Sequence, residues 1–379
     1  MLTALVISFI ALLSYANGAN DVSKGIATLV GSRVTSYKRA IAWGTIWTIA
    51  GGIVAAFFAL ELVKTFSATE ILRSPSRLNQ VLPLSVSLGA FVWVICATRT
   101  GLPVSTTHAI IGAICGVGIA AVGINEVGWA VLGKKIFLPL VLSPILALSI
   151  SWIFSPLIQS LSSRAERYCL CLEVRDGFSS KPVMVSTGIH STVTEVPPLP
   201  QAMLMAAEKN ACSESLLSPI RFEVLDLLHW LSAGMTSFAR GLNDAPKIVA
   251  LALGASALET QISSITSFLL VALVMGLGSI LSGLKVTETL AEKVTPMNPQ
   301  EGFSANLTTS VLVGIAARFG LPVSTTHVSG GAIISIGLKR GSKTVKWRIV
   351  LEMIMAWLIT LPVSGLIGFS AFWILNRIS

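Results

Sequence analysis

The chain has 379 residues, of which 53% are hydrophobic and only 12% are charged. Ordinary soluble domains carry about 25% charged residues, so this composition excludes a soluble protein of two or three domains and indicates a polytopic membrane protein. Lys and Arg outnumber Asp and Glu by 27 to 18, but no basic run lies in a polar domain that could present it to a nucleic acid. We therefore assign the positive charge to loops and expect the lipid bilayer, not nucleic acid, as a partner.

Apolar segments long enough to cross about 30 Å of hydrocarbon recur along the chain. Two further apolar pairs are each split by Gly-Leu-Pro, which ends a helix because proline lacks a backbone donor. We interpret each pair as a helical hairpin, re-entrant or spanning, that returns the chain to the side it entered. In chain order the predicted elements are spans at 1–31 and 40–64, a hairpin at 81–99 with 106–124, spans at 136–160, 220–253 and 263–284, a hairpin at 302–318 with 326–338, and a span at 349–376.

A polar stretch of little periodicity, residues 161–219, separates the third and fourth spans and contains Val-Pro-Pro-Leu-Pro at 196–200. We expect a mobile or lightly structured linker there. Sixteen Lys and Arg residues fall in loops on the side of this linker and six on the other side. The positive-inside rule therefore predicts a plasma (inner) membrane protein with both termini outside and the central loop in the cytoplasm.

The sequence Gly-Leu-Pro-Val-Ser-Thr-Thr-His occurs at 101–108 and again at 320–327. An Asn-Asp pair precedes each copy, with 84 residues from its aspartate to the serine in the first case and 80 in the second. Each unit crosses the membrane an odd number of times, so the second copy enters from the opposite face. We predict an all-α membrane fold of two inverted-topology repeats, each with a broken first helix and a helical hairpin that we expect to be re-entrant. The predicted domains are a first transmembrane repeat at 1–160, the cytoplasmic polar loop at 161–219 and the second, inverted repeat at 220–379.

Each Asn-Asp pair lies in the middle of an otherwise apolar segment. A carboxylate at membrane depth is costly unless it is paired, hydrated or bound to a cation. Asn and Asp supply hard oxygen ligands that suit an alkali cation in a broken helix. The alternative is that each aspartate pairs with the lysine three residues later, Lys24 or Lys247. The predicted cation ligands are Asn20, Asp21, Asn243 and Asp244.

Three hydroxyl residues begin the second helix of each predicted hairpin. Free backbone N–H groups at a helix N-terminus, with hydroxyl donors beside them, suit a tetrahedral oxyanion. Plain N-capping is the alternative, and it would account for one hydroxyl of each triplet. The predicted anion ligands are Ser105, Thr106, Thr107, Ser324, Thr325 and Thr326.

His108 and His327 follow these hydroxyls and raise the alternative of a serine hydrolase. No acidic residue neighbours either histidine locally and no G-x-S-x-G elbow is present, so we expect no enzyme and assign both imidazoles to hydrogen bonds within the hairpins or to titration with substrate. Three arginines lie near the hairpin ends and the second broken helix, and we expect them to snorkel to the interface rather than to draw anions inward. They are Arg99, Arg240 and Arg318.

Together these motifs resemble the inorganic phosphate transporter (PiT) family. The resemblance rests on Gly18–Asp21, Gly241–Lys247, the two hairpin motifs and the stretch Lys285–Phe303, and it covers nearly the whole chain outside the central loop. It implies a cation-coupled symporter of inorganic phosphate with two inverted repeats, usually a homodimer. It also implies that the hydroxyl triplets contact phosphate, and that the Asn-Asp pairs, including Asp21 and Asp244, contact coupling cations, the phosphate or both.

Two details bear on the transported ions. Sodium-coupled members of the family tend to carry a small or polar neutral residue where Lys24 stands, whereas Lys247 resembles proton-coupled and bacterial members. The Asn-Asp pairing resembles that of the sodium-dependent members of the family, so we expect Na+ rather than H+ as the coupling ion. We expect no other cofactor. A carboxylate acceptor favours phosphate over sulfate because phosphate keeps an O–H donor near neutral pH. The alternatives are a sulfate permease of the same architecture and a phosphate receptor that does not transport.

Overall fold

The computed structural model describes residues 2–72, 81–175, 182–187, 190–195, 201–208, 221–256 and 264–378. The chain forms two compact units, one made of Met1–Ile158 with His229–Ser379 and the other of Gln159–Leu228. In its described residues the first unit consists of helices joined by short turns, apart from one isolated bridge between Leu72 and Val127.

The helices up to the central segment are α1 (Leu2–Asp21), α2 (Ser23–Gly31), α3 (Tyr37–Phe58), α4 (Leu60–Thr65), α5 (Ala68–Ile71), α6 (Val81–Thr100), α7 (Thr106–Val122), α8 (Trp129–Val131) and α9 (Leu138–Ala165). Those that follow it are α11 (Val224–Ser256), α12 (Ser264–Ser282), α13 (Leu284–Glu288), α14 (Pro299–Arg318), α15 (Thr325–Arg340) and α16 (Trp347–Ile378). Single turns of 3-10 helix at Ile124–Glu126 and Ser342–Thr344, and of π-helix at Leu132–Phe137 and Thr289–Lys293, complete the pattern.

Six helical stretches of the described residues are long and apolar enough to cross a membrane, in agreement with the predicted multi-pass architecture. The predicted span at 220–253 overlaps α11 (Val224–Ser256), which is not one of these six stretches and carries buried charged side chains at Arg240, Asp244 and Lys247. The six stretches are Leu2–Gly31, Tyr37–Phe58, Val81–Thr100, Trp129–Ala165, Ser264–Ser282 and Trp347–Ile378.

Both predicted hairpins are present as helix pairs, α6 with α7 and α14 with α15. In each pair the first helix ends just before a glycine with a left-handed backbone, Gly101 (φ 77°) or Gly320 (φ 69°). This conformation favours glycine because it has no Cβ atom. The second helix then begins after a serine N-cap. The Gly-Leu-Pro signal therefore located both turns correctly.

The expectation of a broken first helix in each repeat is wrong for the second copy. Between α1 and α2 a single residue, Val22, interrupts the assignment and keeps helical dihedral angles (φ −56°, ψ −34°). The helix α11 continues without interruption through the second Asn-Asp pair and contains Pro246 in its interior. An interior proline removes one backbone hydrogen bond and its ring crowds the carbonyl four residues earlier, but α11 continues past Pro246.

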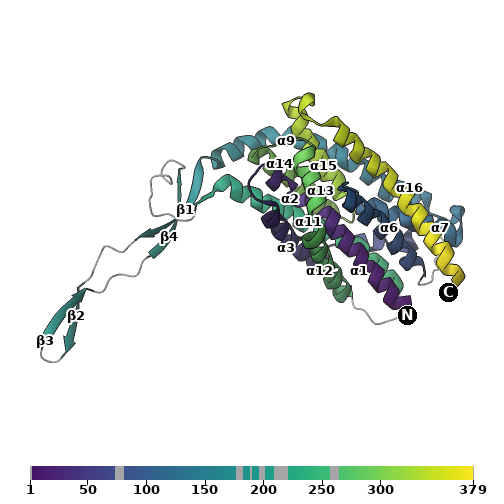
Figure 1. Ribbon diagram of the computed structural model, residues 1–379, viewed down its shortest axis with the longest axis horizontal. Helices are drawn as coiled ribbons and strands as arrows, with labels where there is room; N and C mark the ends of the chain where they lie inside the picture. The colour runs from purple at the N-terminus through teal and green to yellow at the C-terminus, as the bar shows by residue number, and fades with distance from the viewer. Residues whose placement is uncertain are drawn as a thin grey trace. The chain divides into compact units, whose positions relative to one another are not determined.

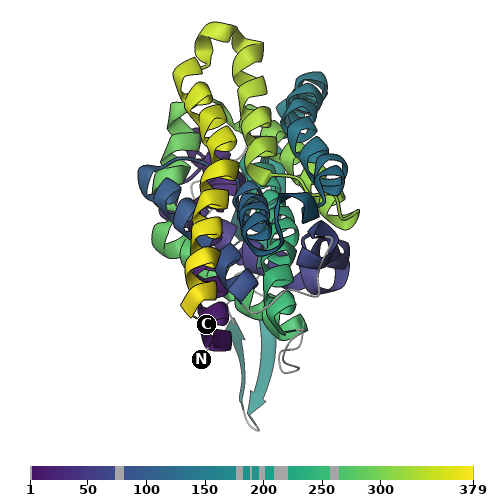
Figure 2. The same cartoon turned by 90° about the vertical axis from the view of Figure 1, so that its right-hand side faces the viewer.

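The helices of the first unit pack side by side, with α16 against α6 and α7, and α1 against α6 and α12 (Figures 1 and 2). The start of α1 and the end of α16 lie at the same end of this bundle. Close helix contact depends on small residues. A Cβ atom at Gly18 would lie 1.9 Å from the carbonyl oxygen of Met275, and one at Gly278 would lie 2.0 Å from that of Tyr15. This contact between α1 and α12 fixes the part of α1 that carries the first Asn-Asp pair.

The second unit contains strands where a lightly structured linker was expected, so the all-α prediction holds only for the first unit. Antiparallel pairing joins β1 to β4 and β5, and β2 to β3, which satisfies the backbone groups of these segments. In β2 the alternation of Val183, Val185 and Thr187 was an overlooked signal. The Pro-rich stretch at 196–200 lies outside the described residues. The strands are β1 (Tyr168–Arg175), β2 (Pro182–Thr187), β3 (His190–Glu195), β4 (Gln201–Glu208) and β5 (Arg221–Glu223).

Candidate anion and cation site

The structure brings all the residues predicted to bind ions together inside the first unit. None of them is more than 3% exposed. Hydrogen bonds join the four segments that carry them: Thr106 donates to Asp21, Lys247 donates to Thr107, and Thr326 donates to the backbone of Val104. The two hairpin turns and the two Asn-Asp segments therefore form one buried polar cluster. The predicted ligands in this cluster are Asn20, Asp21, Ser105, Thr106, Thr107, Asn243, Asp244, Ser324, Thr325 and Thr326.

In the first half of the cluster, Lys24 lies among the oxygens that were predicted to bind a cation. Its Nζ atom is 2.6 Å from Asn20 Oδ1, 2.6 Å from Asp21 Oδ1 and 2.8 Å from the backbone oxygen of Asn20. The amide of Asn20 also donates to Thr98 Oγ1 and to the Leu102 carbonyl, both at 3.0 Å. The ion pair proposed as the alternative to cation binding is thus present here.

In the second half, Lys247 bridges the two halves of the cluster. Its Nζ atom is 3.2 Å from Asp244 Oδ1, 2.9 Å from the Val323 carbonyl and 2.7 Å from Thr107 Oγ1. Asn243 uses its amide nitrogen, which donates to Asp244 Oδ1 at 2.9 Å and to Val323 at 3.2 Å. Asn243 Oδ1 has no hydrogen-bond partner among the described residues, so this hard oxygen is available to a cation.

Asn17 connects the two aspartates, and sequence analysis missed it. Its amide nitrogen donates to Asp21 Oδ2 at 3.0 Å and to Asp244 Oδ2 at 3.4 Å, while its Oδ1 has no partner in the described part of the chain. Asn17 precedes Asp21 by four residues and therefore lies on the same face of α1. That spacing was the available signal, but the second copy has no asparagine at the matching place.

The two serines of the hydroxyl triplets cap helices, as the capping alternative allowed for one residue of each three. Ser105 Oγ accepts from the backbone N–H of His108 at 3.2 Å, and Ser324 Oγ accepts from that of His327 at 3.3 Å. Two helix N-termini, each with free backbone N–H groups and a positive dipole end, therefore meet at the cluster. This arrangement can hold an oxyanion.

The two histidines lie against each other, with ring centroids 4.6 Å apart, and the ring of His327 also lies 4.1 Å from that of Trp357. Neither imidazole hydrogen-bonds to a serine hydroxyl within the described ranges. A Ser-His dyad for nucleophilic catalysis is therefore not formed here. The ring stack instead joins α7 to α15 and α16.

Arg240 differs from the expectation that the three arginines snorkel to the interface. Arg99 and Arg318 are exposed, but Arg240 is 0% exposed. Its three guanidinium nitrogens have no hydrogen-bond partner in the parts of the chain that the structure describes. The reason is its place on α11, one turn before the second Asn-Asp pair, where the helix is buried.

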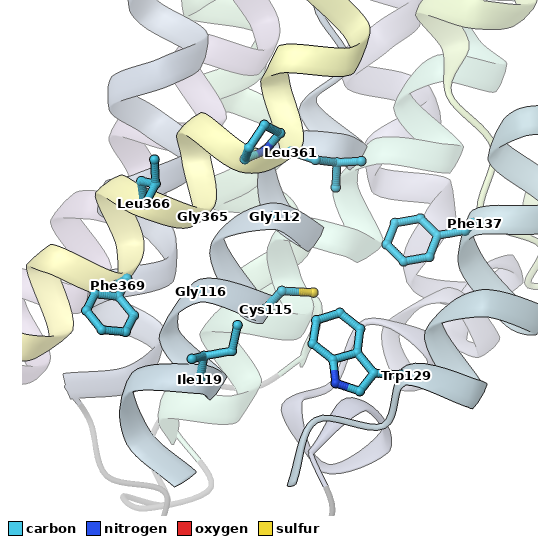
Figure 3. A pocket seen from close by; sticks show the side chains of 11 residues that line it. Gly112, Cys115, Gly116, Ile119, Trp129, Phe137, Leu361, Gly365, Leu366 and Phe369 are labelled. Atoms are coloured by element: carbon cyan, nitrogen blue, oxygen red, sulfur yellow. The ribbon is translucent and has the colours of Figure 1, made fainter. Parts of the chain in front are cut away.

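Two cavities among the described residues are lined mainly by apolar side chains, and the smaller one reaches Val323, whose carbonyl oxygen accepts from Lys247 and Asn243. The larger, of about 490 Å³, lies between α7, α8 and α16 and is lined by apolar and small side chains such as Ile119, Trp129 and Phe369, together with Cys115 (Figure 3). The second, of about 300 Å³, is lined mainly by apolar residues of α9 and α14. Neither cavity includes a predicted ion ligand, so neither competes with the buried cluster as a site for an inorganic anion.

Comparison with known proteins gives consistent matches along the chain. The model of the phosphate transporter family matches residues 17–368. A protein of Bacillus subtilis described as a "probable low-affinity inorganic phosphate transporter" is 28% identical, over 100% of this chain and 98% of its own length. A protein of Rhizobium meliloti with the same description is 26% identical, over 93% of this chain and 90% of its own. A solved structure described as the sodium-dependent phosphate transporter has a TM-score of 0.76 and 22% identity, with full coverage of both chains, and so shares the fold.

Proposed function

The chain belongs to the phosphate transporter family, and we propose that it imports inorganic phosphate by symport with a cation, Na+ rather than H+, through alternating access. The observation that carries this proposal is the buried cluster itself. Two helix N-termini with hydroxyl donors and two Asn-Asp pairs lie within one hydrogen-bonded network, although the sequence separates them widely. An oxyanion and a hard cation are the ligands that these groups suit.

We assign phosphate to the residues at the hairpin turns and to the aspartates. The phosphate ligands are Ser105, Thr106, Thr107, Ser324, Thr325, Thr326, Asp21 and Asp244. Asp244 Oδ2 has only a long contact, 3.4 Å from the Asn17 amide, and is therefore placed to accept a hydrogen bond from a phosphate O–H group. Sulfate has no such donor, which favours phosphate over the sulfate-permease alternative.

We assign Na+ to oxygens of the two Asn-Asp pairs, with Asn17 Oδ1 and Asn243 Oδ1 as acceptors that lack a partner among the described residues. The relative described as sodium-dependent, which shares the fold over its whole length, supports Na+ as the cation. The ammonium group of Lys24 contacts three of the expected oxygens. Na+ binding there therefore requires Lys24 to withdraw, which makes Lys24 a competitor of the coupling ion.

We further propose that the two halves of the first unit are inverted repeats. Their local geometry supports this proposal, since the caps Ser105 (φ −95°, ψ 112°) and Ser324 (φ −96°, ψ 114°) are nearly identical. Each hairpin also ends in a left-handed glycine and a turn of 3-10 helix. After each turn the indole of Trp129 or Trp347 donates to a carbonyl five residues earlier. A homodimer in the plasma membrane, with both termini outside and the central segment in the cytoplasm, completes the proposal.

The test is uptake of radiolabelled phosphate into proteoliposomes that contain the full chain. We expect an inward Na+ gradient to drive uptake that unlabelled sulfate does not inhibit. Uptake driven by a pH gradient alone would refute Na+ coupling, and strong inhibition by sulfate would favour the sulfate permease. Absence of phosphate uptake under either gradient would refute the transport proposal.

A further inference from the structure

The guanidinium group of Arg240 is fully buried and lacks a hydrogen-bond partner among the described residues. Burying an unpaired cation is among the most unfavourable arrangements in a protein, and such groups are normally paired and hydrogen-bonded. A guanidinium has five N–H donors in a planar fork, so the unmet demand is large. The position therefore calls for an acceptor that carries negative charge.

Arg240 faces the buried cluster. On α11 it precedes Asp244 by four residues and Lys247 by seven, a spacing that puts the three side chains on one face of the helix. Asp244, on this face, is linked through the amide of Asn17 to Asp21 of α1. The Oδ1 atom of each aspartate is already paired with a lysine, that of Asp21 with Lys24 at 2.6 Å and that of Asp244 with Lys247 at 3.2 Å.

The cluster also carries one positive charge in excess. Its charged side chains are three bases, Lys24, Arg240 and Lys247, and two acids, Asp21 and Asp244. The one further buried charged side chain in the described part of the protein is Glu301, which pairs with Arg340 at 2.7 Å. The two lysines neutralise the two aspartates, and the guanidinium remains without a counter-charge.

We propose that Arg240 binds the transported oxyanion directly, through its guanidinium group. This inference rests on the proposed phosphate transport and adds a ligand that the repeated motifs do not contain. The planar fork of arginine matches two oxygens of a tetrahedral oxyanion. A singly charged phosphate, or a doubly charged phosphate accompanied by one cation, brings the cluster to neutrality.

The test compares Arg240→Met and Arg240→Lys with the wild-type chain, and uses Arg318→Met as the matched control because Arg318 is exposed. Binding of radiolabelled phosphate to the purified protein and thermal unfolding without phosphate are measured for each. We expect Arg240→Met to weaken phosphate binding at least tenfold, Arg240→Lys to weaken it less, and the control to bind as the wild type. Without phosphate, Arg240→Met should melt at the same temperature as the wild type or higher, because it removes an unpaired buried charge.

Phosphate binding by Arg240→Met within twofold of the wild type would overturn the inference while leaving the transport proposal intact. A lower melting temperature of phosphate-free Arg240→Met would also overturn it, since the guanidinium would then stabilise the protein without the anion. A wild-type chain that binds neither phosphate nor sulfate would overturn the transport proposal and the inference together.

Discussion

The buried pair of Asp21 and Lys24 allows the stability and the transport roles of the cluster to be separated. Asp21→Asn removes the partner of an ammonium group that is 2.6 Å away and inaccessible to solvent. Breaking a buried pair in this way costs about 3–5 kcal/mol, because one charge stays behind uncompensated. Lys24 keeps its contacts with two oxygens of Asn20, so we expect a loss near the lower end, about 3 kcal/mol.

The double variant Asp21→Asn with Lys24→Gln removes both charges. Neutral hydrogen bonds can then replace the ion pair, and we expect the free energy of unfolding to return to within about 1 kcal/mol of the wild-type value. Phosphate uptake should be lost in the single and in the double variant, because the carboxylate is absent from both. Thermal unfolding in detergent and uptake into proteoliposomes measure the two effects.

Glu61 and Lys64 provide the matched control, since they form an ion pair at the same spacing but with side chains more than half exposed. Glu61→Gln should change the free energy of unfolding by less than about 1 kcal/mol and leave uptake unchanged. Wild-type uptake by the double variant would refute the role of Asp21 in the site. A single variant as stable as the wild type would refute the argument from the buried pair.

Substitutions at three further positions, two of them with a matched control, test other parts of the structure. Lys24→Gln should lower the Na+ concentration that half-saturates uptake, because the ammonium no longer competes for the oxygens it contacts; an unchanged requirement would exclude that competition. Gly18→Ala should destabilise the fold by about 1–3 kcal/mol or more, because the added Cβ atom would lie 1.9 Å from the Met275 carbonyl oxygen. Gly133→Ala is the control: no atom lies within 4 Å of its Cβ position, so it should unfold like the wild type. Ser105→Ala should lower the free energy of unfolding by about 1 kcal/mol because the N-cap is lost, while Ser105→Gly should lower it by only a few tenths. If both variants weaken phosphate binding equally, by about 1–3 kcal/mol, the Ser105 hydroxyl is a phosphate ligand. If phosphate affinity is unchanged in both, the hydroxyl acts as a helix cap alone.

The hairpins and the composition of the cluster could be predicted from the sequence because their signals are local. Gly-Leu-Pro marks a helix end wherever it occurs, and a verbatim repeat locates two equivalent turns. An aspartate in an apolar segment is unusual enough to single out Asp21 and Asp244. That Asp21 and Asp244 would lie near one another inside the bundle was predicted from the internal repeat alone.

Three features could not be predicted in this way. Asn17 and Arg240 have no counterpart of the same residue type in the other copy, so the comparison of the two copies did not identify them as members of the cluster. Whether an arginine near a helix end reaches the interface or stays inside depends on the helices packed around it, which no local pattern reports. The continuity of α11 through Pro246 likewise depends on tertiary packing, which can keep a proline inside a helix.

The two lysines of the cluster are not equivalent, and the difference bears on alternating access. The hydrogen bonds of Lys24 among the described residues go to Asn20 and Asp21, which precede it by four and three residues. Lys247 instead donates a hydrogen bond at 2.7 Å to Thr107, which lies in the first turn of α7. Movement of one half of the first unit against the other would therefore break the contact of Lys247 with Thr107 and leave the contacts of Lys24 intact. If a cation binds beside Asp21 as proposed, it competes with a lysine three residues away in the sequence, whereas the contact of Lys247 with Thr107 joins the two halves of the first unit. Under the proposed mechanism, the first lysine sets cation affinity and the second couples substrate binding to the movement.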